Sequence, residues 1–237
     1  MKLRLIKTAI LLMLFTTTCE QALALSTTRL VYLDPLFGGK DKGPLIARNT
    51  FAKTITFNFS QQLKQLLEAQ NIGIVLSRDH DTAVLLEERI MMARSRGPNA
   101  YITLNVSKTK RACIWLYSPQ QPQSKLQKEK QSVKEHGESI EKLLIEERIR
   151  ESGLLANAIY TSIKQKSVPV CLEKGGGSKQ FENSYILENV HSPVIIINFG
   201  VSDSASPYVL DSALMNEIVN AVSEGVKEYF AVSQPSK

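Results

Sequence analysis

Few side chains in this sequence have the types and spacing that metal binding or nucleophilic catalysis requires. The histidines are His80, His136 and His191, and no two of them have the spacing of metal ligands on one element. Cys113 and Cys171 have no evident histidine partner, and the sequence contains no Gly-x-Ser-x-Gly segment. The residues therefore indicate neither a metal centre nor a paired nucleophile and base, and we expect the histidines in solvated or loop positions.

Two weaker patterns have ordinary alternatives. Asp34, Asp41 and His80 could approach one another as a metal site, but an aspartate at the end of a strand more often fixes the following loop. The run at residues 174–179, K-G-G-G-S-K, lacks the spacing of a phosphate-binding loop. We interpret it as a connector.

Composition is that of a globular protein with one ordinary core. The chain has 237 residues, of which 43% are hydrophobic and 22% charged, and its formal net charge is +6. Basic residues form no stripe with interleaved aromatic residues, so the pattern argues against a nucleic-acid partner.

The first 24 residues have the pattern of a secretory signal peptide. Lys2, Arg4 and Lys7 precede an apolar run at residues 9–15, and Ala-Leu-Ala follows at residues 22–24. The run is too short to span a membrane. We expect cleavage after Ala24 and location in the periplasm or cell envelope; a buried N-terminal helix is the alternative.

The cysteines leave two questions open. Cys19 lies in the expected signal peptide, and the Thr-Thr-Thr before it fits a lipoprotein signal poorly. Cys113 and Cys171 remain in the mature chain, where an oxidising compartment would permit a disulfide between them. Sequence alone does not show that they meet, so two unpaired thiols are the alternative.

Hydrophobic periodicity predicts strands that alternate with helices. This order indicates a single α/β domain with a mixed, mostly parallel sheet flanked by helices. The continuous apolar run at residues 194–198 is typical of a central strand covered on both faces. Strands are expected at residues 29–34, 72–77, 101–106, 113–117 and 194–198, and helices at residues 50–70, 85–94 and 212–230.

A charged segment at residues 125–151 interrupts this order. It carries seven positive and seven negative residues, with a narrow apolar stripe of Leu126, Val133, Ile140 and Leu144. We interpret it as an inserted helix that the core does not need, followed by a second helix at residues 153–165. It could bind a partner protein; a solvated helix without a partner is the alternative.

Five segments resemble motifs of a known family. Residues 33–43 read L-D-P-L-F-G-G-K-D-K-G and are similar to L-D-x-G-H-G-G-x-D-x-G, and residues 101–105, Y-I-T-L-N, are similar to F-I-S-I-H. Residues 75–89, 179–187 and 193–202 match three more motifs in order. The chain resembles the zinc-dependent N-acetylmuramoyl-L-alanine amidases of bacterial cell walls over roughly residues 29–230.

This resemblance implies a zinc ion held by two histidines and a glutamate, with a second glutamate as general base. In this sequence the ligand positions fall on Phe37, Ala52 and Asn105, and the general-base position falls on Asn198. These residues cannot replace the originals, because they offer no good zinc ligand and no proton acceptor near neutral pH. We therefore expect no zinc, no other cofactor and no catalytic residue.

The sequence thus predicts an exported, amidase-like pseudoenzyme. It would bind peptidoglycan or an envelope protein through the former cleft, at Asp34, Phe37, Asn105 and Asn198. An active amidase with a non-standard site is the alternative. A third possibility is a structural subunit of an envelope assembly.

Overall fold

The computed structural model describes residues 29–120, 140–166, 168–169, 171–175, 184–202 and 207–233. The expected signal peptide, Cys19 and residues 125–139 of the charged segment lie outside this part of the chain. Within it, no helix is both long and apolar enough to cross a membrane.

The centre of the molecule is a six-stranded mixed sheet. All neighbouring strands are parallel except β8 and β6, so the predicted fold class is confirmed. Strand β8 extends three residues beyond the predicted run, and the edge strand β7 was not predicted. The spatial order is β4 (Gly73–Leu76), β1 (Leu30–Pro35), β5 (Ala100–Lys108), β8 (Val194–Val201), β6 (Cys113–Tyr117) and β7 (Cys171–Gly175).

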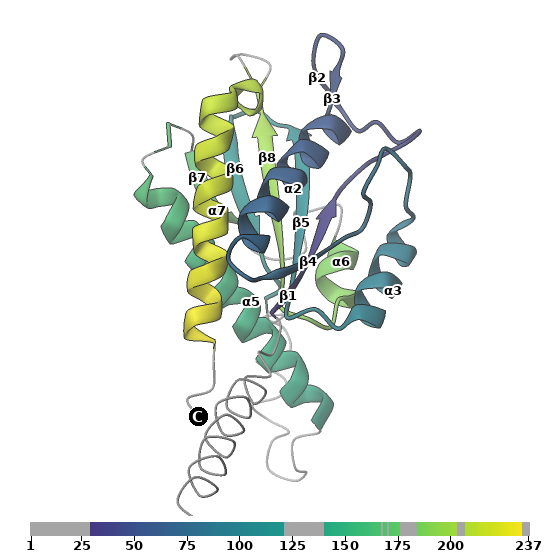
Figure 1. The fold of residues 1–237 in the computed structure, drawn as a ribbon, viewed down its shortest axis with the longest axis vertical. Coiled ribbons are helices and arrows are strands. Elements are labelled where there is room, and N and C mark those ends of the chain that lie inside the picture. The colour runs from purple at the N-terminus through teal and green to yellow at the C-terminus, as the bar shows by residue number, and fades with distance from the viewer. Residues whose placement is uncertain are drawn as a thin grey trace, which may run out of the picture.

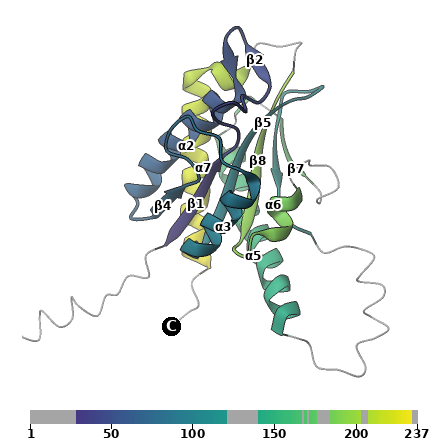
Figure 2. The same cartoon turned by 90° about the vertical axis from the view of Figure 1, so that its right-hand side faces the viewer.

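Helices cover both faces of the sheet (Figures 1 and 2). One face carries α2 (Ala52–Glu68), α5 (Ile140–Gln165) and α7 (Ser212–Val232), which enclose the larger hydrophobic core. The other face carries α3 (Leu86–Arg96) and the short α6 (Ser184–Asn189) over a smaller core. The hairpin of β2 (Leu45–Ala47) and β3 (Thr50–Phe51) precedes α2, and the 3-10 turn η2 (Tyr208–Leu210) precedes α7.

Strand alternation decides which residues can form a site. In β5, Ile102, Leu104 and Val106 belong to the larger core. The intervening positions, including Tyr101 and Asn105, therefore point to the face of α3 and α6. These positions therefore lie on a strand whose opposite face is packed into the larger core.

Helix α5 corrects our interpretation of the charged segment. It runs without a break from Ile140 through Gly153 to Gln165, where we expected two helices. The Arg148 guanidinium donates to the carbonyl oxygens of Leu187 at 3.0 Å and Val190 at 2.5 Å. The C-terminal end of the segment is therefore hydrogen-bonded to α6 and to the residue that follows it.

A second contact fixes the same end of the segment. The Glu151 carboxylate accepts a hydrogen bond from the Tyr229 hydroxyl of α7 at 2.9 Å. Ser152, the next residue, accepts a hydrogen bond from the backbone N–H of Val194 at the start of β8, also at 2.9 Å. Any separable part of the insertion must end before Arg148.

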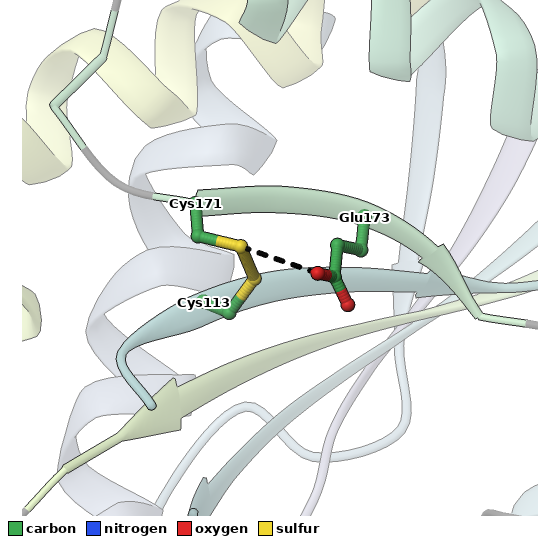
Figure 3. A group of neighbouring side chains, drawn as sticks. All are labelled: Cys113, Cys171 and Glu173. Atoms are coloured by element: carbon green, nitrogen blue, oxygen red, sulfur yellow. Dashed lines mark hydrogen bonds between the residues drawn. A yellow bond between two sulfur atoms is a disulfide. The ribbon is translucent and has the colours of Figure 1, made fainter. Parts of the chain in front are cut away.

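A disulfide joins Cys113 and Cys171, which decides the question that the sequence left open (Figure 3). The two residues are direct partners in the parallel pair of β6 and β7. The bond ties the edge strand to the rest of the sheet across a sequence separation of 58 residues.

Removing this disulfide is expected to destabilise the protein. Replacing both cysteines by serine should lower the free energy of unfolding by about 2–4 kcal/mol, because the unfolded chain loses a long cross-linked loop. Urea denaturation monitored by circular dichroism measures the change. Dithiothreitol should produce a similar loss in the wild type and none in the double variant; equal stability of the two proteins would contradict the prediction.

Candidate functional site

The loop after β1 brings two of the four family positions together. The backbone N–H of Leu36 donates to the carbonyl of Leu104 at 3.0 Å, which places the loop beside β5. A Cβ atom at Gly43 would come within 2.8 Å of the Phe37 ring and 2.9 Å of the Ala52 Cβ. Phe37 and the fully buried Ala52, the first residue of α2, therefore both lie close to Gly43.

The other two positions are direct neighbours on β5 and β8. Asn105 and Asn198 are paired in register, and the Asn105 side chain donates from Nδ2 to Asn198 Oδ1 at 2.9 Å. The Ser107 hydroxyl donates to the same oxygen at 3.0 Å. The two asparagines are only 6% and 3% exposed, and the Asn105 Oδ1 is buried without a hydrogen-bond partner.

These four residues do not fit a zinc ion. Phe37 and Ala52 have no side-chain lone pair to donate. Asn105 and Asn198 are neutral amides, and the hydrogen bond between them occupies one polar atom of each. Zinc in proteins takes histidine nitrogen, cysteine sulfur or carboxylate oxygen, and none of these is present at the four positions.

Asp34 was expected to line a binding groove, but the structure places its side chain in the interior. It is fully buried, where its carboxylate pairs with Arg89 and accepts hydrogen bonds from Ser77 at 2.6 Å and Tyr101 at 2.9 Å. Burial, together with the charge of Asp34, raises the pKa of Tyr101, so its hydroxyl stays protonated and donates. Arg89 also donates to the Pro35 carbonyl. Through Arg89, Asp34 thus stabilises the loop that follows β1. Its side chain is not accessible to a ligand.

The structure does not bring together the possible metal ligands Asp34, Asp41 and His80. Asp41 accepts a hydrogen bond from the backbone of Gly43, and the exposed His80 contacts its neighbour Asp79. Within the described residues, Asp34, Asp41 and His80 do not form a group at ligand distances. Such a group does form from Cys113, Cys171 and Glu173, but both of its sulfur atoms belong to the disulfide (Figure 3).

The sheet register extends the asparagine pair into a row of four residues. Asn198 is also paired with Trp115 on β6, and Trp115 is paired with Glu173 on β7. Register partners point to the same face of a sheet. Asn105, Asn198, Trp115 and Glu173 therefore lie side by side across β5, β8, β6 and β7.

Sequence reasoning missed the second half of this row. Trp115 is the only tryptophan in the chain, and its predicted strand was correct. A signal was thus available, since a lone tryptophan in a strand beside a candidate site merits attention. Its neighbours could not be found, because β7 was not predicted and a strand's neighbours depend on the topology.

The predicted partner helix is tested only in part. Leu126 and Val133 lie outside the described residues, whereas Ile140 and Leu144 are 77% and 65% exposed at the start of α5. A cavity of about 510 Å³ is adjacent to this end of α5. Its lining includes Leu144, Arg148 and His191. The exposed apolar residues leave partner binding as a prediction.

Comparison with known proteins identifies one family over most of the chain. The family model described as N-acetylmuramoyl-L-alanine amidase matches residues 31–228. The probable cell wall amidase LytH of Staphylococcus saprophyticus is 24% identical over 207 residues, which are 85% of this chain and 58% of that protein. This chain thus spans little more than half the length of that relative.

Solved structures share the fold. The N-acetylmuramoyl-L-alanine amidase of Clostridium difficile matches with a TM-score of 0.68 at 18% identity, over 88% of this chain and all of that one. AmiC2 of Nostoc punctiforme matches with a TM-score of 0.65 at 18% identity, over 87% and 99% of the two chains. The CwlD amidase of Clostridioides difficile, solved in complex with the GerS lipoprotein, has a TM-score of 0.63 at 16% identity, over 86% and 100%.

Proposed function

Because this chain belongs to the N-acetylmuramoyl-L-alanine amidase family, we propose that it is an exported amidase-like protein that binds peptidoglycan without hydrolysing it. One observation carries the proposal: the hydrogen bond between Asn105 and Asn198, at positions where the resemblance expects a zinc ligand and the general base.

The argument against hydrolysis is chemical. Cleavage of an amide bond by an activated water needs a group that takes up the proton of that water. The amide of Asn198 has no such basicity near neutral pH, and its Oδ1 already accepts hydrogen bonds from Asn105 and Ser107. Nothing at Phe37 or Ala52 could hold a metal ion to compensate.

The argument for binding rests on an unsatisfied group. A buried acceptor without a partner costs about 1–3 kcal/mol, and the Asn105 Oδ1 is such an acceptor. An N–H of a bound peptide would satisfy it after a rotation of the Asn105 side chain that brings this oxygen to the surface of the sheet. Side-chain amides carry both donors and acceptors, as peptide amides do, so the asparagine pair suits the bond that a catalytic relative would cut.

Export is part of this proposal. The basic, apolar and Ala-Leu-Ala segments of residues 1–24 favour it. The disulfide between Cys113 and Cys171 supports it, since such bonds persist in oxidising compartments.

Three measurements on purified residues 25–237 test the proposal. We expect the protein to sediment with peptidoglycan sacculi, to contain well below one zinc per chain by elemental analysis, and to release no soluble muropeptides. Stoichiometric zinc, or hydrolysis that a chelator abolishes, would establish an active amidase instead. Absence of sedimentation would favour a purely structural subunit.

Variants locate the binding site. Asn105→Ala should weaken sacculus binding about tenfold, the equivalent of one or two hydrogen bonds. Asn157→Ala is the matched control, because Asn157 lies exposed on α5 away from the row. Equal binding by the two variants would place recognition elsewhere.

A further inference from the structure

Trp115 is held in a fixed orientation on the sheet. Its indole N–H donates to Glu173 Oε2 at 2.9 Å. Its six-membered ring lies over Gly200, where an added Cβ would come within 1.9 Å of the Trp115 Cζ3 atom. Only glycine leaves room for the ring at this position, and the side chain remains partly exposed. The result is a pre-positioned aromatic surface.

Glu173 is held in turn from its other side. Arg111 forms an ion pair with its Oε1 atom, while Oε2 accepts the indole N–H of Trp115. Both Arg111 and Glu173 are substantially exposed. A partly exposed aromatic ring is thus bordered by a carboxylate and a guanidinium whose positions are set by each other.

This combination matches the chemistry of a sugar. One face of a pyranose ring presents C–H groups that pack on an aromatic ring, while its hydroxyl and acetamido groups need hydrogen-bond partners at the edge. Trp115 offers the apolar surface, and Glu173 and Arg111 offer the acceptor and the donors.

The position of the surface points to the same ligand. Neighbouring strands are about 4.8 Å apart, so Trp115 lies roughly 5 Å from Asn198 and 10 Å from Asn105 in the row. The family name describes an amide between an N-acetylated sugar acid and L-alanine. A ligand whose amide lies at the asparagine pair has its sugar within reach of the next strand.

We infer that Trp115, with Glu173 and Arg111, forms a subsite for an N-acetylated sugar of the glycan strand. The inference rests on the proposed function and states in which direction the ligand runs across the strands of the sheet. The sugar lies over β6 and β7, on the side of Asn198 away from Asn105.

The single tryptophan makes the subsite directly observable. Titration of the intact mature protein with the tetramer of N-acetylglucosamine, which has no peptide, should shift or quench the fluorescence of Trp115 in a saturable manner. An equal concentration of maltotetraose, which lacks acetamido groups, should produce a much smaller change. A saturable signal supports the subsite; no change at millimolar tetramer overturns it.

Variants measured by calorimetry separate recognition from packing. Trp115→Ala should lower affinity for the tetramer at least tenfold, Trp115→Phe should restore part of it, and Glu173→Gln should lower it severalfold. Tyr185→Ala is the control, because Tyr185 is an exposed aromatic residue outside the row. Unchanged affinity in Trp115→Phe and Glu173→Gln, or an equal loss in Tyr185→Ala, would overturn the inference.

The outcomes also distinguish this inference from the proposed function. If sacculus binding falls in Asn105→Ala but is unaffected in Trp115→Phe and Trp115→Ala, and the tetramer does not bind, only the sugar subsite fails. If the intact protein binds neither sacculi nor tetramer, both fail.

Discussion

Four substitutions made together, Phe37→His, Ala52→Glu, Asn105→His and Asn198→Glu, are expected to create a zinc site at positions whose present residues are poor zinc ligands. The loop after β1, the start of α2 and the adjacent strands β5 and β8 already bring these positions together. We expect one zinc per chain and an increase in affinity of at least a thousandfold, because three ligands on separate elements act together. Equilibrium competition with a chromogenic chelator measures it.

The local structure favours two of these changes. Phe37 has a φ of 68°, which is unfavourable for a bulky residue and less so for histidine. Ala52 is the first residue of α2, whose first turn contains no acidic residue, so a glutamate there would interact favourably with the helix dipole. The fold should therefore tolerate the new residues.

The single variants are the controls for this experiment. Each should bind zinc no better than the wild type, because one ligand cannot hold the ion. Stoichiometric zinc in a single variant, or a folded quadruple variant that remains metal-free, would show that the assigned positions are wrong. Hydrolysis is a harder demand, since surrounding groups must also orient the ligands.

Asp34→Ala is expected to have the largest effect on stability of any single change considered. It removes the partner of Arg89 and leaves a guanidinium buried and uncompensated. Breaking a buried ion pair in this way costs about 3–5 kcal/mol. The hydroxyls of Ser77 and Tyr101 lose their acceptor at the same time.

Thermal and urea denaturation measure this effect. Glu224→Gln is the control, because it breaks the exposed ion pair with Lys166 and should leave the transition nearly unchanged. If Asp34→Ala behaved like the control, the network would not hold the loop. Loss of sacculus binding by a folded Asp34→Ala protein would show that the loop, and with it Phe37, had moved.

The sequence by itself determined most of the secondary structure and the chemical character of the site. Apolar runs predicted β1, β4, β5, β6 and β8. The pattern is clearest in β1 and β8, because a strand buried on both faces tolerates few other residues. Residue types alone predicted poor zinc ligands at Phe37, which has no side-chain lone pair, and at Asn105, a neutral amide, because these properties do not depend on the fold.

Tertiary structure decided what depends on neighbours distant in sequence. Strand β7 is short and half-polar, so no local pattern indicates it, and its pairing with β6 joins segments that are distant in sequence. Helix α5 continues through Gly153 because contacts of Arg148, Glu151 and Ser152 outweigh the weak helix propensity of glycine.

The same reason explains the two surprises at the site. Asp34 is hidden because Arg89, 55 residues away, supplies a charge that makes its burial favourable. Trp115 joins the asparagine pair because β6 runs antiparallel to β8, a pairing that strand patterns do not encode. Local sequence fixes which atoms each residue offers, and only packing between distant segments fixes which of those atoms meet.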